Sequence, residues 1–479
     1  MKRIFLLLVA LVISVAAFAK IEPADVCTSG MVLQQNTKVL LWGTADGGTK
    51  VKVQPSWSKQ SYDVQADSEG RWVVYVDTPA ASYTPYKIEF SSGKDKVVVG
   101  DILIGEVWVA SGQSNMEMPV KGFHNNPVEN SIDYIAGAAA PDKIRMFMVP
   151  MKRSYTPETR VEATWKGATP ETVPDMSATA YFFARKLNEV LDVPVGIVCP
   201  AYGGTRVEAW LPREVLETYP EEDLSKEAIE KRHHANRPML MYNAMIYPVK
   251  GYTIKGFVWY QGCSNVYAPE KYVSRLSDMV GTWRKDWRDA ENALPFYQVE
   301  IAPFNYYNNG TDKASLLRKS QHDAAKAIPN CGVIVTNDLV KPYEYDNIHP
   351  CMKREVGDRL AFLALNRDYG YKTIDCYSPE ALGCEKVEGR DNQLAVILDN
   401  APRGLDRWHD IKGLEVAGED GVFYPVTTAH FDCGRKTLWV VSPSVPKPVQ
   451  ARYCWGDFNP GNLHTIAGLP VSPFWVKLN

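Results

Sequence analysis

Between residues 101 and about 368, short apolar runs alternate with longer segments whose apolar residues recur at helical spacing. The apolar runs occupy residues 104–110, 193–199, 254–260, 296–302 and 331–336. The helical segments occupy residues 178–191, 271–284 and 316–327. Strands and helices in alternation favour a parallel sheet with helices on both faces. The pattern therefore predicts a three-layer α/β domain over residues 101–371.

The segments on either side of this region have a different pattern. Residues 20–100 alternate short strand-like runs with turn sequences such as A-D-G-G and D-S-E-G. Residues 372–479 return to short strand-like runs. Both patterns predict β-sandwich-like modules, one before and one after the α/β domain. A length of 479 residues exceeds what one hydrophobic core holds, which agrees with several domains.

Residues 1–19 have the features of a secretory signal peptide. Lys2 and Arg3 precede an apolar stretch over residues 4–15, and A-F-A at 17–19 fits a cleavage site before Lys20. The sequence therefore predicts an exported protein, either secreted or, in a Gram-negative bacterium, periplasmic. No later run is apolar enough to cross a bilayer, so no membrane insertion of the mature chain is expected.

Charge and cysteine content exclude some classes of function. The formal net charge of −3 leaves no basic surface for nucleic acid, so no nucleic-acid partner is expected. The nine cysteines include no C-x-x-C pair, so neither a zinc ribbon nor a redox pair is indicated. Export permits disulfides, and Cys376 with Cys384 is one local option, with buried free thiols as an equal alternative. The sequence leaves the disulfide pairing and the oligomeric state unknown.

The first apolar run of the α/β region leads into S-G-Q-S-N-M at residues 111–116. Ligands of parallel sheets lie beyond the carboxyl ends of the strands, which is where Ser114 is expected. A serine nucleophile needs a base, and the base needs an orienting group. The loop Y-D-N-I-H-P at residues 345–350 supplies both, with His349 as base and Asp346 as its orienter. The sequence thus predicts a catalytic triad.

An acyl-transfer site also needs hydrogen-bond donors for the developing oxyanion. A-Y-G-G-T-R follows the second apolar run and offers the backbone N–H groups of Gly203 and Gly204, where no Cβ blocks a ligand. W-Y-Q-G-C-S-N-V follows the third run and offers the side-chain amides of Gln261 and Asn265. These groups are the candidate oxyanion hole.

Four motifs occur along the chain in this order: G-Q-S-N-M, G-G-T-R-V-E-A-W, W-Y-Q-G-x-S-N and D-N-I-H-P. With the tail at residues 452–474, they resemble the sialate O-acetylesterase family, the sialic-acid-specific branch of the SGNH (GDSL-like) hydrolases. The resemblance covers most of the mature chain. It implies a serine esterase without metal or other cofactor that removes O-acetyl groups from sugars, typically sialic acids, through an acyl-enzyme. It also implies that the Ser114 N–H joins the oxyanion donors, with Gln261 favoured over Asn265.

Further polar residues are candidates for contact with the substrate. Arg206 is placed to meet the carboxylate of a sialic acid, with Glu208 as an alternative, structural partner. Asn243 is placed to bond sugar hydroxyls, with a packed helix start as the alternative. Gln113 and Asn115, on either side of Ser114, complete the set. His322 lies on a polar helical segment and is expected to be exposed.

The sequence departs from the family at Cys263, where Glu is common in Q-G-E-S-N. Two other functions stay open. One is the same chemistry on another acetylated glycan, such as acetylated xylan. The other is a non-catalytic carbohydrate-binding protein, which the joint presence of Ser114, Asp346 and His349 argues against. The exact glycan, the hydroxyl position, the role of each β module and the effect of Cys263 are not fixed by the sequence.

Overall fold

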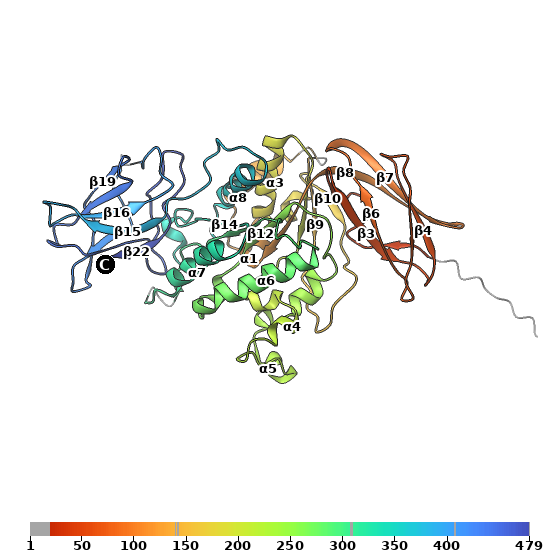
Figure 1. Cartoon of the computed structure of the whole chain (residues 1–479), viewed down its shortest axis with the longest axis horizontal. Coiled ribbons are helices and arrows are strands. Elements are labelled where there is room, and N and C mark those ends of the chain that lie inside the picture. Colours follow the sequence, from red (N-terminus) through yellow and green to blue (C-terminus); the bar gives the residue numbers. More distant parts are fainter. Residues whose placement is uncertain (1–19, 139, 141–142, 307–309, 407–408, 479) are drawn as a thin grey trace, which may run out of the picture.

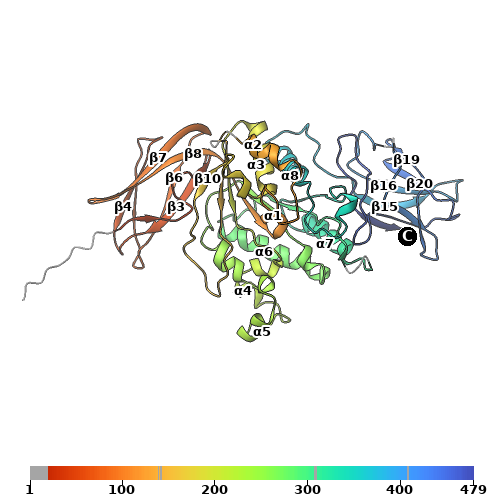
Figure 2. The ribbon, with the colours of Figure 1, turned by 180° about the vertical axis from the view of Figure 1, so that it is seen from behind.

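The structure is a computed structural model that describes residues 20–138, 140, 143–306, 310–406 and 409–478. The predicted signal peptide, residues 1–19, lies outside the described residues. The molecule is elongated (Figures 1 and 2). An α/β region lies in the middle, with one set of β-strands at each end, drawn in red and orange for the amino-terminal set and in blue for the carboxy-terminal set.

A large mixed sheet forms the middle of the molecule. Its main path has the order β10-β9-β11-β8-β12-β13-β14. The strands are β8 (Asp95–Gly112), β9 (Ile144–Met148), β10 (Trp165–Gly167), β11 (Val195–Cys199), β12 (Gly256–Tyr260), β13 (Phe296–Val299) and β14 (Cys331–Ile334). Neighbours from β9 to β14 along this path are parallel, and β10 pairs antiparallel with β9. All five predicted apolar runs contain strands of this sheet, whereas β9 and β10 were not predicted.

Helices cover both faces of the sheet. Alternate residues of β12 enter different cores, with Phe257 and Trp259 in one and Val258 and Tyr260 in the other, as the two-residue period of a strand requires. On one side α3 (Ala178–Leu191) packs against α8 (Lys353–Asp368), and on the other α6 (Tyr272–Asp286) packs against α7 (Lys313–Ala327), as Figure 1 shows. The three predicted helices are therefore confirmed.

Shorter helical segments connect these elements. The α-helical ones are α1 (Ser114–Glu117), α2 (Ser131–Ala136), α4 (Arg213–Leu216) and α5 (Lys226–Lys231). The 3₁₀ turns are η1 (Val173–Asp175), η2 (Val207–Trp210), η3 (His234–Asn236), η5 (Cys263–Asn265), η6 (Pro269–Lys271) and η8 (Pro342–Glu344). The segment η4 (Tyr242–Ile246) is a single π-helical turn, a form that often occurs at functional sites.

The amino-terminal strands join the central sheet through one long strand. A separate three-stranded sheet contains β1 (Glu22–Pro23), β3 (Lys38–Thr44) and β6 (Arg71–Asp77). The other amino-terminal strands are β2 (Val32–Gln34), β4 (Lys50–Pro55), β5 (Tyr62–Gln65) and β7 (Ser82–Ser92). Strand β8 pairs with β7 over its first part and with β11 and β12 over its last part. The predicted boundary after residue 100 therefore falls inside β8.

Two four-stranded sheets form the carboxy-terminal part, with orders β15-β16-β20-β19 and β18-β17-β21-β22. Their strands are β15 (Ala381–Lys386), β16 (Leu394–Leu398), β17 (Leu414–Ala417), β18 (Phe423–Pro425), β19 (Thr428–Asp432), β20 (Thr437–Val441), β21 (Gln450–Tyr453) and β22 (Phe474–Lys477). A core of its own, which includes Val396, Val440 and Tyr453, lies among these strands.

Helix α7 ties the carboxy-terminal strands to the central sheet. Arg318 donates to the backbone carbonyls of Ile301, at 3.1 Å, and Asp457, at 3.0 Å. His322 is buried between two carboxylates, with Nε2 2.8 Å from Glu300 Oε2 and Nδ1 3.2 Å from Glu380 Oε1. The expectation that His322 is exposed was wrong, because Glu380, which precedes β15, packs over this helix.

All nine cysteines are free thiols. Cys376 and Cys384 form no disulfide, so the fold rests on packing and hydrogen bonds. Within the described ranges, no helix combines the length and the apolar character that a membrane span requires.

The contact between His322 and its two carboxylates predicts a loss of stability at alkaline pH. Burial alone would lower the pKa of His322, but the hydrogen bonds to Glu300 and Glu380 outweigh it and raise the pKa to about 9. A pKa raised from about 6.5 stabilises the folded state fully below pH 6.5, and this contribution is lost as the pH rises through 9. At about 1.4 kcal/mol per pH unit, we expect a loss of about 3 kcal/mol.

The free energy of unfolding in urea, measured from pH 6 to 10, tests this expectation. His322→Gln removes the titrating group, so the difference in stability between the two proteins should shrink as the pH rises. A difference that stays constant over this range would contradict the assigned role of His322.

Candidate active site

The end of strand β8 is held on both sides just before Ser114. Tyr202 N–H donates to Gly112 O at 3.0 Å, and Gln113 N–H donates to Tyr260 O at 3.0 Å. Gly112 has φ +142°, and a Cβ there would lie 2.2 Å from Tyr260 O, so only glycine fits. The chain then turns into the short helix α1, which begins with Ser114. The serine therefore lies at the carboxyl edge of the sheet, as predicted.

Asn115 connects this turn to the loop that carries His349. Its side chain is 1% exposed, and Nδ2 donates to Ile348 O at 2.9 Å. Residues 115 and 348 are the direct neighbours of Ser114 and His349. The structure thus joins the residues next to the predicted nucleophile and the predicted base, which are more than 230 positions apart in the chain. Among the described residues, no hydrogen bond connects Ser114 to His349 Nε2, so their pairing stays a prediction.

His349 is half-buried, and its ring packs edge-on against Phe123 with 5.3 Å between the ring centroids. Its Nε2 is buried and has no hydrogen-bond partner among the described residues. Burial, and then the charge of Lys353, lower the pKa of His349 to about 4. The imidazole is therefore neutral at physiological pH and can accept a proton.

Asp346 lies in the same loop, but its carboxylate has another partner. Its Oδ1 accepts a hydrogen bond from Asn305 Nδ2 at 2.7 Å. In the part of the chain that the structure describes, Asp346 makes no hydrogen bond to His349, whose own backbone N–H donates to Asn347 Oδ1 at 2.9 Å. The role of Asp346 as orienter stays a prediction.

The glycine turn after β11 lies against Ser114. A Cβ at Gly203 would lie 3.3 Å from Ser114 Cβ, so the absence of a side chain allows this approach. The Gly203 N–H donates to Glu117 Oε2 at 2.5 Å. Burial raises the pKa of Glu117, whereas this hydrogen bond opposes the rise. Among the described groups, the N–H groups of Ser114 and Gly204 have no acceptor.

The predicted side-chain amides form a buried network beneath the turns. Gln261 Nε2 donates to Thr205 O at 2.9 Å and to Asn265 Oδ1 at 2.8 Å. Asn265 Nδ2 donates to Glu208 Oε2 at 3.1 Å. Gln113 Oε1 accepts from Gly262 N–H at 3.1 Å. Both Gln261 N–H bonds are thus used within the protein, and its place in the oxyanion hole stays a prediction.

The side chain of Arg206 makes no hydrogen bond or ion pair with any residue that the structure describes, and its Nε is buried. The alternative partner, Glu208, instead lies 3.8 Å from Arg275 Nε and bonds Asn265. Asn243 lies in the π-helical turn and donates from Nδ2 to Ser154 O at 3.2 Å. Asn236 Oδ1 is buried without a partner in the described chain, and the preceding residue, Ala235, lies against Gly204.

Sequence reasoning missed three residues that shape the site. Glu117 holds the glycine turn, and Glu344 holds both ends of the His349 loop, because its carboxylate accepts from Lys341 N–H at 2.7 Å and from Cys351 N–H at 2.8 Å. Lys353 donates from Nζ to Asn115 Oδ1 at 2.5 Å. In the sequence, these three residues differ from other charged residues only in that each lies a few positions from Ser114 or His349.

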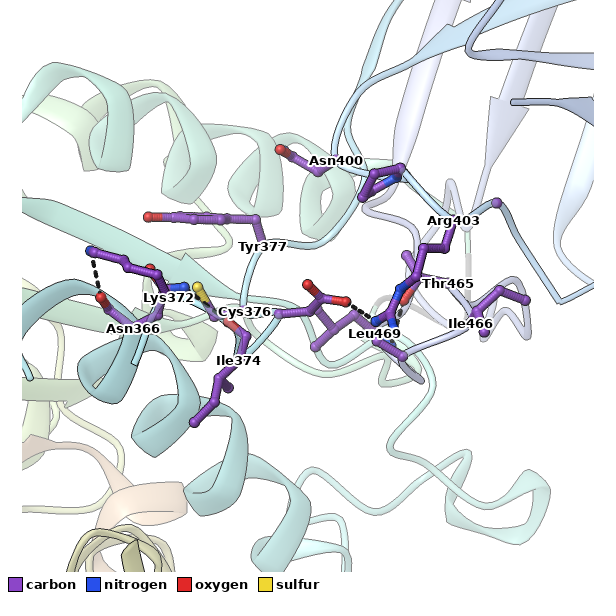
Figure 3. A pocket seen from close by; sticks show the side chains of 14 residues that line it. Asn366, Lys372, Ile374, Cys376, Tyr377, Asn400, Arg403, Thr465, Ile466 and Leu469 are labelled. Atoms are coloured by element: carbon purple, nitrogen blue, oxygen red, sulfur yellow. Dashed lines mark hydrogen bonds and ion pairs between the residues drawn. The ribbon is translucent and has the colours of Figure 1, made fainter. Parts of the chain in front are cut away.

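The site has no arrangement that suggests a metal. Among the residues described, no group of three or more His, Cys, Asp or Glu side chains is placed to hold an ion. A separate cavity of about 240 Å³ lies between the end of α8 and the carboxy-terminal strands (Figure 3). Its lining includes the ion pair of Arg403 with Asp375, and it contains none of the predicted site residues.

Comparison with known proteins gives consistent matches. The family model described as "Carbohydrate esterase, sialic acid-specific acetylesterase" matches residues 104–366. The sialate O-acetylesterase of Homo sapiens is 28% identical over 395 residues, which cover 76% of this chain and 74% of that protein. The sialate O-acetylesterase of Mus musculus is 27% identical over 405 residues, with 73% and 74% covered.

A solved structure is similar over nearly the whole chain. The carbohydrate acetylesterase from Xanthomonas citri superposes with a TM-score of 0.82 at 30% sequence identity. The match covers 95% of this chain and 99% of that one. The similarity therefore includes the strands at both ends as well as the central region.

The burial of His349 predicts an acidic titration of its ring. We expect a midpoint near pH 4 instead of the usual value near 6.5, because the protonated ring is poorly solvated and close to Lys353. The ¹⁵N chemical shifts of the imidazole, followed by NMR from pH 3 to 8, measure this midpoint. His124, which is exposed, serves as an internal reference. A His349 midpoint above 6 would contradict the burial of the ring.

Proposed function

The chain belongs to the sialic acid-specific acetylesterase family of carbohydrate esterases, and from this premise we propose that it removes O-acetyl groups from sialic acids through an acyl-enzyme on Ser114. His349 serves as the general base and acid. The observation that carries the proposal is the 2.9 Å hydrogen bond between Asn115 Nδ2 and Ile348 O, which joins the neighbours of these two residues.

The first half-reaction forms the acyl-enzyme. Ser114 Oγ attacks the acetyl carbonyl carbon while His349 Nε2 takes the hydroxyl proton. Nε2 suits this task because it is buried and has no partner among the described residues. The acyl C–O bond of the ester then breaks, and the proton on Nε2 passes to the sugar oxygen, which leaves as a hydroxyl.

The second half-reaction releases acetate. Water gives a proton to His349 Nε2 and attacks the acetyl carbonyl, and Ser114 Oγ leaves and recovers that proton. In each half the oxyanion needs donors that are not already engaged. The N–H groups of Ser114 and Gly204 meet this condition among the described residues. The Gly203 N–H becomes available to the oxyanion only if its hydrogen bond to Glu117 breaks.

Asp346 remains the proposed orienter of His349. Its position three residues before the histidine supports this role, and its hydrogen bond to Asn305 opposes it. For this role the carboxylate must exchange its bond to Asn305 for one from His349 Nδ1. Cys263 is not a substitute, because burial raises the pKa of its thiol.

Arg206 supports sialic acid as the acyl-bearing sugar. Its guanidinium follows the glycine turn that lies against Ser114 and has no carboxylate partner in the described chain. A buried guanidinium nitrogen without a partner is costly, and a ligand carboxylate would satisfy it in a bidentate manner. The remaining candidates, Asn243 with Gln113 and Asn115, use their amides within the protein, so their contact with substrate stays a prediction.

Another acetylated glycan is the second candidate substrate. The similarity to a carbohydrate acetylesterase over nearly the full chain favours it. A neutral glycan such as acetylated xylan carries no carboxylate, so it would leave Arg206 without its proposed role. The substrate preference of an Arg206 variant therefore separates the two.

We also propose the finer domain organisation and the export of the protein. Residues 101–371 would form the SGNH-like catalytic domain, and residues 20–100 and 372–479 would form β-sandwich-like modules, with strand β8 shared across the first boundary. The basic and apolar pattern of residues 1–19 supports export to the periplasm or the medium.

Ser114→Ala is expected to abolish esterase activity. Without the hydroxyl no acyl-enzyme forms, and loss of a triad nucleophile costs about 10⁶-fold in kcat. Hydrolysis of 4-nitrophenyl acetate measures this loss, and Ser111→Ala is a control on the same strand whose hydroxyl only donates to Pro200 O. An active Ser114→Ala protein would reject the mechanism. Turnover that resists a serine-directed phosphonate would do the same, and no turnover of any acetyl ester would favour a non-catalytic carbohydrate-binding protein.

Arg206→Gln is expected to discriminate between the two substrate classes. With 9-O-acetylated sialic acid, KM should rise about 10- to 100-fold, because a charge-assisted contact of about 1.5–3 kcal/mol is lost. With acetylated xylan or 4-nitrophenyl acetate, KM should change little. An equal effect on charged and neutral substrates would show that Arg206 does not bind a carboxylate.

A further inference from the structure

We propose that Lys353 is a positioning residue for the esterase reaction, which acts through Asn115 to hold the nucleophile turn and the His349 loop in one arrangement. This inference rests on the proposed function and adds a residue to it. Lys353 is the first residue of helix α8, and it lies four positions after His349.

The contacts of Asn115 carry the argument. Lys353 Nζ donates to Asn115 Oδ1 at 2.5 Å, and Asn115 Nδ2 donates to Ile348 O at 2.9 Å. The planar amide therefore joins the start of α8 to the His349 loop. Thr179 Oγ1 donates to Asn115 O at 3.1 Å and fixes the backbone of the same residue. With Oδ1 held by Lys353, the amide group cannot flip, and its N–H remains directed at Ile348 O.

The burial of a lysine at this position is costly, which argues against a purely structural role. Lys353 is 1% exposed, and its Nζ lies 5.5 Å from the centre of the Tyr260 ring. It stands in the first turn of a helix, where the helix dipole disfavours a cation. No carboxylate among the described residues lies within ion-pair distance. An apolar side chain would fill this space at lower cost.

The charged groups around Lys353 come from several elements. Burial lowers the pKa of Lys353 to about 7, although Glu344 of η8, Cys263 of η5 and Cys351 oppose this shift. The His349 ring is also close enough to interact with this charge, which lowers its pKa in addition to burial. Below neutral pH, Lys353 therefore carries a charge that adds to the effect of burial in lowering the pKa of His349. The residue thus has two effects on the base, one on its position and one on its protonation.

Two substitutions separate these effects. Lys353→Met removes both the donor and the charge, whereas Lys353→Gln removes the charge and keeps a donor for Asn115 Oδ1. For Met, we expect kcat to fall about 100-fold with KM within about 3-fold, because a displacement of about 1 Å at the base has this cost. For Gln, kcat should recover to within about 10-fold of the unmodified protein.

The pH profile provides a readout that a merely structural role would not change. The acid limb of kcat/KM, expected near pH 4 in the unmodified protein, should move to higher pH in both variants, because the positive charge beside His349 is gone while the ring stays buried. Lys319→Met, at an exposed lysine of α7 that pairs with Asp323, is the matched control and should leave kcat and the limb unchanged.

A double variant tests whether Lys353 acts through Asn115. If it does, Lys353→Met combined with Asn115→Ala should lose no more activity than the worse single variant. Fully additive losses would overturn the shared role. The inference would also be overturned if the Lys353→Met protein had a kcat within 2-fold of that of the unmodified protein and an acid limb within 0.2 pH unit of it.

The outcomes also separate this inference from the proposed function. If Ser114→Ala is inactive while Lys353→Met behaves as the unmodified protein, only the role of Lys353 is wrong. If Ser114→Ala stays active, the mechanism itself is wrong. Circular dichroism and the thermal midpoint establish that each variant is folded. If Lys353→Met does not fold, the acid limb of Lys353→Gln decides the question, and an unchanged limb overturns the inference.

Discussion

The amide of Asn115 determines whether the two halves of the site meet. Ser114 depends on the central sheet for its place, and His349 depends on a loop that is more than 230 residues further along the chain. The Asn115 side chain donates its amide N–H to that loop, and its oxygen accepts a hydrogen bond from Lys353. Because these groups are buried, the loss of each hydrogen bond would cost about 1–3 kcal/mol of stability. The relative position of the two segments is therefore closely fixed. Catalytic geometry is therefore a property of the packed core as much as of the exposed turn.

The carboxy-terminal strands also reach this loop. Phe304 N–H donates to Asp457 O at 3.2 Å, and Asn305 N–H donates to Tyr345 O at 3.0 Å. The Tyr345 ring packs edge-on against Phe458, with 5.0 Å between centroids. The tail signature at residues 452–474, quoted among the family motifs, thus supports the segment before His349. Stabilisation of this loop is enough to explain why the carboxy-terminal part accompanies the α/β region.

Local patterns predicted the elements well, because five apolar runs and three helices follow from period and turn residues alone. Strand β9 was missed because Arg145 interrupts its apolar run, and the guanidinium of Arg145 bonds remote groups that include Gly30 O and Asp101. The position of Ser114 at a strand end and the proximity of the His349 loop agree with expectation. The partners of Gln261 and His322, and the lack of a described partner for the Arg206 side chain, could not be read from the sequence, since each depends on which distant residue faces it. Position along the chain identifies reactive groups, whereas long-range packing decides which of their hydrogen bonds remain free.

Strand β8 has a consequence for how such a protein can change over generations. It begins among the amino-terminal strands, where it pairs with β7, and it ends at Gly112, two residues before Ser114. A chain cut at residue 101 would start inside this strand and expose the edge where β7 had paired. The amino-terminal strands therefore cannot be shuffled or exchanged as an independent cassette. A substitution that shifts the amino-terminal strands would also shift β8 and with it Ser114, so selection acts on both at once.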